Sequence, residues 1–204
     1  MAESGREPVD RDKRTTLRRF AALGAASPLA AFIGSSSESD ARSAIAGYIS
    51  STPGAHFSKI RDDLSLGTGE TQHHLKRLVD AGALESHMDG EYRRYFPADK
   101  FSTFERRALG YLRRDTPRGM AIALLSDPRT TGSAIAEELE VSTATVSNTA
   151  ADLEEAGLLT RESGYTLDRP ETFIFLLVRY AESFDDRTVA FADRADELIR
   201  YDLS

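Results

Sequence analysis

The chain of 204 residues contains no cysteine. Disulfide bonds, thiolate metal sites and a cysteine nucleophile are therefore excluded. A chain without cysteine fits a reducing cytosol, and we expect a cytoplasmic protein. Lysine is also scarce, because only four of the 26 cationic side chains are lysines, against 33 aspartates and glutamates. Arginine in place of lysine, together with surplus carboxylates, is typical of halophilic proteins from salt-rich cytoplasms, although a GC-rich genome alone also favours arginine.

Net positive charge is lacking as well, since the formal net charge is −7. At molar salt, however, the Debye length falls to about 3 Å, so close contacts rather than net charge would decide binding. The acidity is also uneven: residues 40–97 carry 7 cations and 8 anions, whereas residues 171–204 carry 4 and 8. Net charge is therefore only a weak argument against a nucleic-acid partner.

Motifs for catalysis are missing too. The sequence has no glycine-rich phosphate loop and no nucleophile motif. Its four histidines are His56, His73, His74 and His87. The adjacent pair would point about 100° apart on a helix, which makes the two side chains poor ligands for one metal ion. We therefore expect a protein that is not an enzyme and that uses no cofactor or metal.

What the sequence does contain is one structural unit that occurs twice. Residues 41–84 align with residues 116–159 at an offset of 75 without a gap. The residues that coincide include Pro53 with Pro128, Ser58 with Ser133, Ile60 with Ile135, Leu64 with Leu139, Thr68 with Thr143, Leu78 with Leu153, Ala81 with Ala156, Gly82 with Gly157 and Leu84 with Leu159. Such a repeat indicates two small domains.

Each unit has the pattern of three short helices. In the first unit, apolar residues recur at helical spacing from Ala41 to Ile49, and the helix breaker "STPG" follows. A short second helix, the tight turn "SLG" and a third helix that ends at Gly82 come next. The buried stripes of these two helices are expected to be Phe57, Ile60 and Leu64, and then Leu75, Leu78 and Val79. This order is the helix-turn-helix pattern.

A β-hairpin is expected directly after each third helix. The segment "ALESHMDGEYRRYFP", residues 83–97, has two extended runs around Asp89-Gly90, a pair that favours a two-residue hairpin turn. In the second unit "LLTRESGYTL", residues 158–167, predicts a shorter hairpin that turns at Ser163-Gly164. A three-helix unit followed by a hairpin is a winged helix. The predicted fold class is thus mainly α with small β-wings, as tandem winged helix-turn-helix domains plus C-terminal helices.

At these residues the sequence resembles a known family, the archaeal predicted transcriptional regulators that contain two helix-turn-helix domains. The similar segments are "PGAHFSKIRDDLSLGTGETQHHLKRLVDAGAL", "DGEYRRYFP" and "TGSAIAEELEVSTATVSNTAADLEEAGLL", within roughly residues 41–168. The resemblance implies a sequence-specific DNA-binding regulator of transcription. Winged helices also serve as protein–protein modules, so a tandem winged-helix adaptor is the alternative.

The third helix of the first unit carries the candidate DNA contacts. Gln72 and His73 are suited to reading base edges, and Lys76 and Arg77 to holding phosphates. The wing adds two neighbouring arginines, which suit a narrow minor groove. The predicted DNA-binding residues are Thr68, Gln72, His73, Lys76, Arg77, Arg93 and Arg94. The alternative reading is a plain solvated helix face.

The second unit differs at the equivalent positions. Gln72, His73, Lys76 and Arg77 are replaced by Ser147, Asn148, Ala151 and Asp152, so no cation remains on that helix. Ser147 and Asn148 are its possible base contacts, whereas the flanking carboxylates would face phosphate at a cost. We favour a scaffold, or a surface for a protein or ligand.

The remaining segments flank or join the two winged helix domains, which we expect at residues 40–97 and 116–169. Residues 98–115 are expected to form a linker helix between them. Residues 1–39 form an N-terminal tail in which cations precede an apolar run from Ala21. This run resembles a twin-arginine export signal imperfectly and is short for a membrane span of about 20 residues. We favour a cytoplasmic tail or a packing helix.

Two C-terminal helices are expected in residues 170–204. One face of the first carries Phe173, Leu176, Leu177 and Tyr180, and Pro170 is placed to open it. A second apolar face follows from Thr188 to Ile199. These faces either fold back on the second unit or form a dimer interface. We favour a homodimer, because two half-sites of double-stranded DNA are commonly read by two copies.

Overall fold

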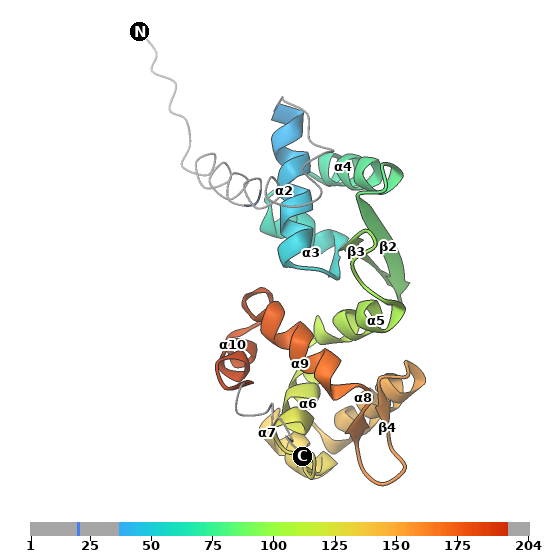
Figure 1. Cartoon of the computed structure of the whole chain (residues 1–204), viewed down its shortest axis with the longest axis vertical. Helices are drawn as coiled ribbons and strands as arrows, with labels where there is room; N and C mark the ends of the chain where they lie inside the picture. Colours follow the sequence, from blue (N-terminus) through green and yellow to red (C-terminus); the bar gives the residue numbers. More distant parts are fainter. Residues whose placement is uncertain (1–19, 21–36, 196–204) are drawn as a thin grey trace, which may run out of the picture. The chain divides into compact units, whose positions relative to one another are not determined.

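The computed structural model describes Phe20 and residues 37–195 (Figure 1). Most of the predicted N-terminal tail and the C-terminal residues Leu198 and Ile199 lie outside this part of the chain. The chain divides into two compact units, of which the first ends at Phe101 and the second begins at Ser102. Both are mainly helical with a small antiparallel sheet, which confirms the predicted fold class. No helix of the described residues is long and apolar enough to cross a membrane.

The first unit consists of three helices and a three-stranded sheet. Its elements are α2 (Ser37–Ser51), β1 (Ala55–His56), α3 (Phe57–Asp63), α4 (Thr68–Asp80), β2 (Leu84–Asp89) and β3 (Tyr92–Pro97). The strands are antiparallel in the order β1-β3-β2. The sequence does not predict β1, since a strand of two residues has no alternating pattern to recognise.

The core of the first unit follows the predicted periodicity. Its fully buried side chains include Ile45, Ile49, Ile60, Leu64, Leu75, Leu78, Leu84 and Phe96. The expected stripe of α4 is therefore confirmed at Leu75 and Leu78, while Val79 is half-buried at the edge. Phe20 of the N-terminal segment packs against this core and meets the Tyr48 ring edge-on at 5.2 Å between ring centroids.

The second unit repeats these helices at the predicted offset. It contains α6 (Asp115–Ser126), α7 (Gly132–Glu138), α8 (Thr143–Glu155), β4 (Leu159–Thr160) and β5 (Thr166–Leu167). Both ends of α7 and α8 lie 75 residues after those of α3 and α4. The repeat extends to the backbone of the tight turn, where Ser65 (φ 52°) and Glu140 (φ 55°) both adopt the left-handed conformation.

The wing of the first unit turns one residue later than the sequence predicts. Asp89 pairs with Tyr92 as the last residue of β2, which leaves Gly90 and Glu91 in the loop. Gly90 has φ 59° while Glu91 has no positive φ, as in a type II′ turn with glycine at its first central position. The turn is displaced because Asp89 belongs to the sheet, where it forms an ion pair with Arg94.

The expected linker helix is part of the second unit. Helix α5 (Thr103–Leu112) buries Ala108, Leu109 and Leu112 and packs on α6 and on the C-terminal helix α9 (Pro170–Arg179). Its polar side chains also bind within the unit: Arg107 donates to the Ala156 carbonyl at 2.6 Å and Tyr111 to the Asp152 carbonyl at 3.1 Å.

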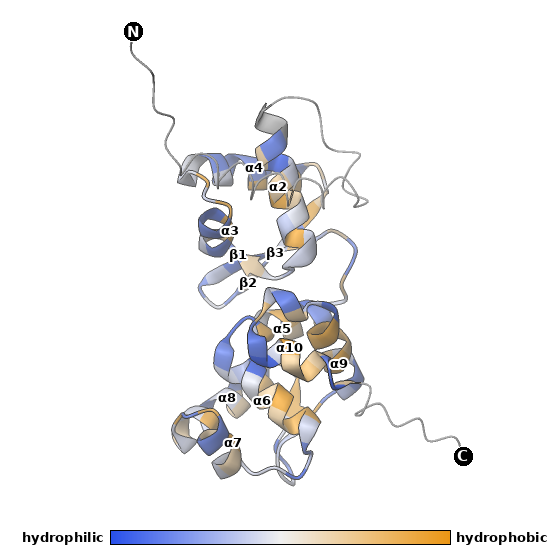
Figure 2. Cartoon of the chain, turned by 90° about the vertical axis from the view of Figure 1, so that its left-hand side faces the viewer, coloured by the Kyte–Doolittle hydropathy of each residue, from blue (hydrophilic) through white to orange (hydrophobic). Residues whose placement is uncertain are grey.

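The C-terminal helices fold back on the second unit. Helix α9 is followed by the 3-10 turn η2 (Ala181–Ser183) and by α10 (Asp186–Ala192), and Pro170 occupies the first turn as predicted. The face of α9 that we expected to form a dimer is buried within the chain instead, at Phe173, Leu176, Leu177 and Tyr180. Figure 2 shows the hydrophobic stretches of α9 and α10 in orange.

A buried arginine joins the start of α6 to the start of α10. Arg118 donates to Asp185 Oδ2 at 2.6 Å, to Asp115 at 2.8 Å and to the Leu112 carbonyl at 2.9 Å. Asp185 also accepts from Thr188 at the first turn of α10. Burial alone would raise the pKa of Asp185, but the hydrogen bonds from Arg118 and Thr188 outweigh it and lower that pKa. The C-terminal helices are thus fixed by a polar anchor as well as by apolar packing.

Two phenylalanines of α9, two residues apart, test this packing. Phe173 is 1% exposed and Phe175 is 53% exposed. We expect Phe173→Ala to lower the free energy of unfolding of the second unit by about 3–5 kcal/mol, because it leaves a cavity in the core. Phe175→Ala should change it by less than about 0.5 kcal/mol. Urea denaturation at low protein concentration measures both, and equal effects would contradict the fold-back arrangement.

Candidate nucleic-acid interface

Helix α4 is held by its buried side and presents a polar face outward. Its first turn is capped by Glu70, which accepts a hydrogen bond from the Gly67 backbone N–H at 3.4 Å. Thr71 and His74 are buried together with the two leucines of the stripe. The predicted contact residues of α4 are all exposed, namely Thr68, Gln72, His73, Lys76 and Arg77. No described residue covers this face, while burial restrains the helix behind it.

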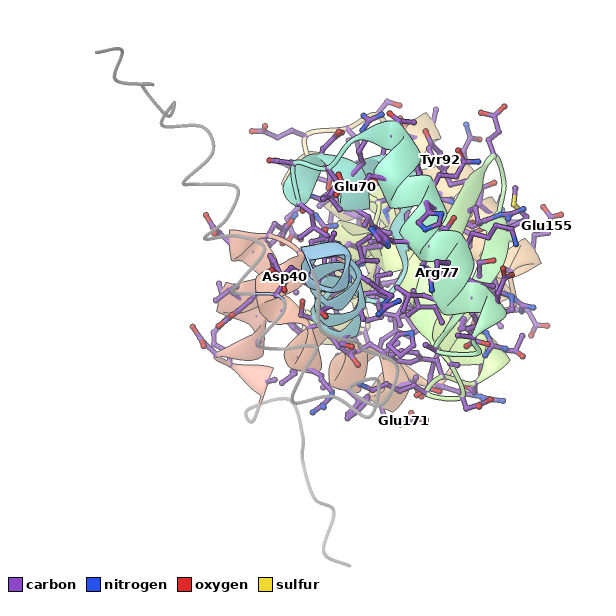
Figure 3. All side chains as sticks on the ribbon, turned by 90° about the horizontal axis from the view of Figure 1, so that it is seen from above. Asp40, Glu70, Arg77, Tyr92, Glu155 and Glu171 are labelled. Carbon is purple, nitrogen blue, oxygen red and sulfur yellow. The ribbon has the colours of Figure 1, made fainter. Side chains whose placement is uncertain are left out.

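The cations of this face are available to a partner. The side chain of Arg77, labelled in Figure 3, makes no hydrogen bond or ion pair with any residue that the structure describes. Lys76 forms an ion pair with Asp80 one turn later at 2.5 Å, and both side chains are well exposed. An exposed pair of this kind contributes less than about 1 kcal/mol, so Lys76 can exchange Asp80 for a phosphate at little cost.

The two arginines of the wing have different roles. Arg93 is exposed and forms no ion pair within the described part of the chain. Arg94 is 3% exposed, donates from Nε to Asp89 at 2.5 Å and from Nη1 to the Gly54 carbonyl at 3.0 Å. Arg94 therefore does not remain among the candidate DNA contacts: it holds the wing instead. Successive side chains of a strand point to opposite faces of the sheet, so the sequence alone already indicated that Arg93 and Arg94 cannot both face the same partner.

His56 has a structural role in this unit. His56 caps α3 by accepting from the Lys59 backbone N–H at 3.4 Å, and its ring lies 5.1 Å from that of Tyr92. Burial, followed by the charges of Arg94 and Lys59, lowers the pKa of His56 below its ordinary 6.5, which keeps the ring neutral and able to accept at neutral pH. No group of three or more histidine, aspartate or glutamate side chains among the described residues could hold a metal ion.

The corresponding face of the second unit is polar but lacks available cations. Ser147 and Asn148 are exposed on α8, as are the carboxylates of Asp152 and Glu155. Arg161, in the loop after β4, is bound to Glu154 at 2.5 Å, and its hydrogen bond is the main cause that lowers the pKa of that carboxyl. This surface offers hydrogen bonds to a partner, but little attraction for phosphate.

Comparison with known protein families finds two helix-turn-helix domains in the chain. Residues 39–109 match a family described as an N-terminal HTH domain, and residues 120–166 match one described as an HTH domain. No curated protein matches the chain. The first match spans the three helices and the wing of the first unit and extends into α5, and the second spans most of the repeated helices of the second unit. Tandem helix-turn-helix domains point to a DNA-binding regulator.

Substitution of the two neighbouring wing arginines tests whether Arg94 stabilises the wing. We expect Arg94→Gln to lower the free energy of unfolding of the first unit by about 1–3 kcal/mol, because Asp89 and the Gly54 carbonyl lose a buried donor. Arg93→Gln removes the same charge from an exposed site and should change it by no more than about 0.5 kcal/mol. Urea denaturation combined with hydrogen exchange of the β2 and β3 amides measures both. Equal protection in the two variants would refute the assignment.

Proposed function

We propose that the protein is a sequence-specific DNA-binding regulator of transcription and that its first unit supplies the main contact. The observation that carries this proposal is the exposed α4 face, where Arg77 and the readily exchanged Lys76 lie on the same helix. Arg93 of the wing adds a third cation, which has no ion-pair partner among the described residues. Cations without internal partners lose no ion pair when they bind phosphate. They therefore favour a polyanionic partner over a plain solvated surface.

The proposed binding mode follows from where these residues lie. Helix α4 enters the major groove, where Gln72 and His73 contact base edges and Thr68 lies at the N-terminal end. Lys76 and Arg77 bind phosphates on either side. Arg93 extends from the wing to the adjacent backbone or minor groove. Each phosphate contact contributes affinity without sequence preference, whereas the base contacts contribute the preference.

We assign a supporting role to the second unit. Ser147 and Asn148 are the side chains through which it would reach bases, but the nearby Asp152 and Glu155 repel phosphate. We propose further that the protein acts in the cytoplasm, without catalysis, as a homodimer on two half-sites. Since the predicted dimer face is buried, pairing through α9 would use its exposed residues Phe175 and Val178.

A protein–protein adaptor is the second candidate. It is favoured by the acidic second unit and by the exposed apolar pair of Phe175 (53% exposed) and Val178 (41% exposed) on α9. Two exposed apolar side chains make a small patch compared with the areas that stable interfaces bury. The basic face of α4 would then have no assigned role, so DNA binding accounts for more of the surface.

Charge removal tests the phosphate contacts. We expect Lys76→Ala, Arg77→Ala and Arg93→Ala each to weaken binding to all DNA sequences and to reduce the slope of log K against log salt by about 1. Lys59→Ala is the matched control, because it removes an exposed cation of α3 that is paired with Asp63. Fluorescence anisotropy over a salt series gives the slopes. If Arg93→Ala binds like the control, the wing has no such role.

Selection of bound fragments from genomic DNA tests sequence preference. We expect purified protein, at a salt concentration matched to its cytoplasm, to enrich a short and roughly palindromic motif. Gln72→Ala and His73→Ala should change the preferred bases, with each lost base contact costing about 1–3 kcal/mol of discrimination. Failure of the folded protein to enrich any motif would contradict sequence-specific regulation and favour the adaptor.

A further inference from the structure

A cleft of about 620 Å³ lies in the first unit between α4 and the wing. Its apolar lining comes from three elements: Phe57 begins α3, Leu75 and Val79 belong to α4, and Tyr95 lies on β3. Leu75 and Tyr95 are buried, whereas Phe57 and Val79 are half-buried. The described core of the unit is thus accessible through this partly open cleft, whose floor is apolar.

The rim of this cleft is polar and cationic. Gln72, Lys76 and Asp80 line it from α4 at intervals of one helical turn, and Ser86 and Arg93 line it from the sheet. Asp80 compensates the charge of Lys76 at 2.5 Å. Arg93 has no carboxylate partner among the described residues, so one positive charge at the rim remains uncompensated. A monovalent anion complements it.

The floor adds a hydrogen-bond donor. Burial raises the pKa of Tyr95, and the charge of Arg93 only partly opposes this shift, so the phenol stays protonated at neutral pH. Its hydroxyl donates no hydrogen bond to the residues that the structure describes. The cleft therefore offers an anion three donor groups: the guanidinium of Arg93, the ammonium of Lys76 and the phenol of Tyr95.

Size and polarity point to an organic ligand. A phosphate group of DNA needs cations and donors, but it gains nothing from a floor of leucine, valine and aromatic rings. The cleft volume lies within the range of about 300–1,000 Å³ that is common for small-molecule sites, which are mostly apolar with a few polar groups. An aromatic ring system with one acidic group matches both parts of the lining.

We propose that this cleft binds an aromatic monoanion, a carboxylate or sulfonate, and that its binding excludes DNA. The acidic group lies at Arg93 and the rings lie on Phe57, Val79 and Tyr95. The competition between the anion and DNA rests on the proposed function, in which Lys76 and Arg93 bind DNA phosphates. Both ligands would then need the same two side chains, so they cannot bind together. By linkage, DNA lowers the affinity for the anion by the same factor as the anion lowers that for DNA.

Two dyes that differ in one group test the cleft without DNA. The probes are 1-anilinonaphthalene-8-sulfonate and its uncharged parent N-phenyl-1-naphthylamine, with the full chain at constant salt. We expect the sulfonate to bind roughly three- to tenfold more tightly than the parent, and Arg93→Ala to remove this difference. Ser86→Phe, which fills the cleft, should abolish binding of both dyes. Fluorescence titration gives the dissociation constants.

The matched control is Arg77→Ala, which removes a cation of α4 that does not line the cleft. It should leave both dyes unaffected while weakening DNA binding. Sulfonate binding that is indifferent to both Arg93→Ala and Ser86→Phe would overturn the site. If the protein binds DNA and dye together without competition, the exclusion is refuted. If it binds dye in the expected way but no DNA, only the proposed function fails.

Discussion

The buried guanidinium of Arg94 is the constraint on which the functional surface of the first unit depends. It binds Asp89 at the end of β2 and the Gly54 carbonyl just before β1, and thereby ties the two outer strands to β3. An unpaired charge in this place would be costly, so the wing is fixed in the arrangement that satisfies it. Two consequences follow. Arg93, the preceding residue, must point to the opposite face, and Tyr95, the following one, points to the same side as Arg93. The exposed cation and the aromatic floor of the cleft are both set by one internal ion pair.

The two units show how one backbone can carry different surfaces. Helices α3 and α7, and α4 and α8, have the same lengths, the same spacing and the same left-handed residue in the turn between them. The cores agree because identical apolar residues, such as Leu78 and Leu153, occupy equivalent positions. The exposed faces are not constrained by that packing and have diverged from cationic to acidic. The second unit uses many of its arginines internally, for example Arg118 with Asp185 and Arg187 with Glu138, whereas Arg77 and Arg93 of the first unit remain unpaired among the described residues. Similar folds therefore do not imply similar partners.

Sequence periodicity predicts the helices well because burial repeats along a helix. It predicts less where contacts between residues distant in the sequence determine the structure. The register of the wing depends on Asp89 reaching Arg94, and the pairing of β1 with β3 depends on residues about 40 positions apart. Helix α5 is assigned to the second unit by packing on α9, some 60 residues later, which no local pattern records. For the candidate site, helical geometry places Gln72, His73, Lys76 and Arg77 outward. That Arg93 is exposed and Arg94 is buried could be predicted only by knowing which face of the strand is covered.

Lys76 and Arg93 belong both to the proposed DNA-binding face and to the cleft. Salt affects binding at these two surfaces differently. Binding of phosphates depends on counterion release and weakens steeply as salt increases. Binding in the cleft depends largely on burial of apolar surface at Phe57, Val79 and Tyr95, which salt does not screen. At high salt, a DNA contact based on charge alone would be weak. In the proposed binding mode, the base contacts of Gln72 and His73 would then decide where the protein binds, and a ligand that occupies Lys76 and Arg93 would need little affinity to displace the DNA. A few side chains at one cleft are thus sufficient to couple a small anion to DNA occupancy.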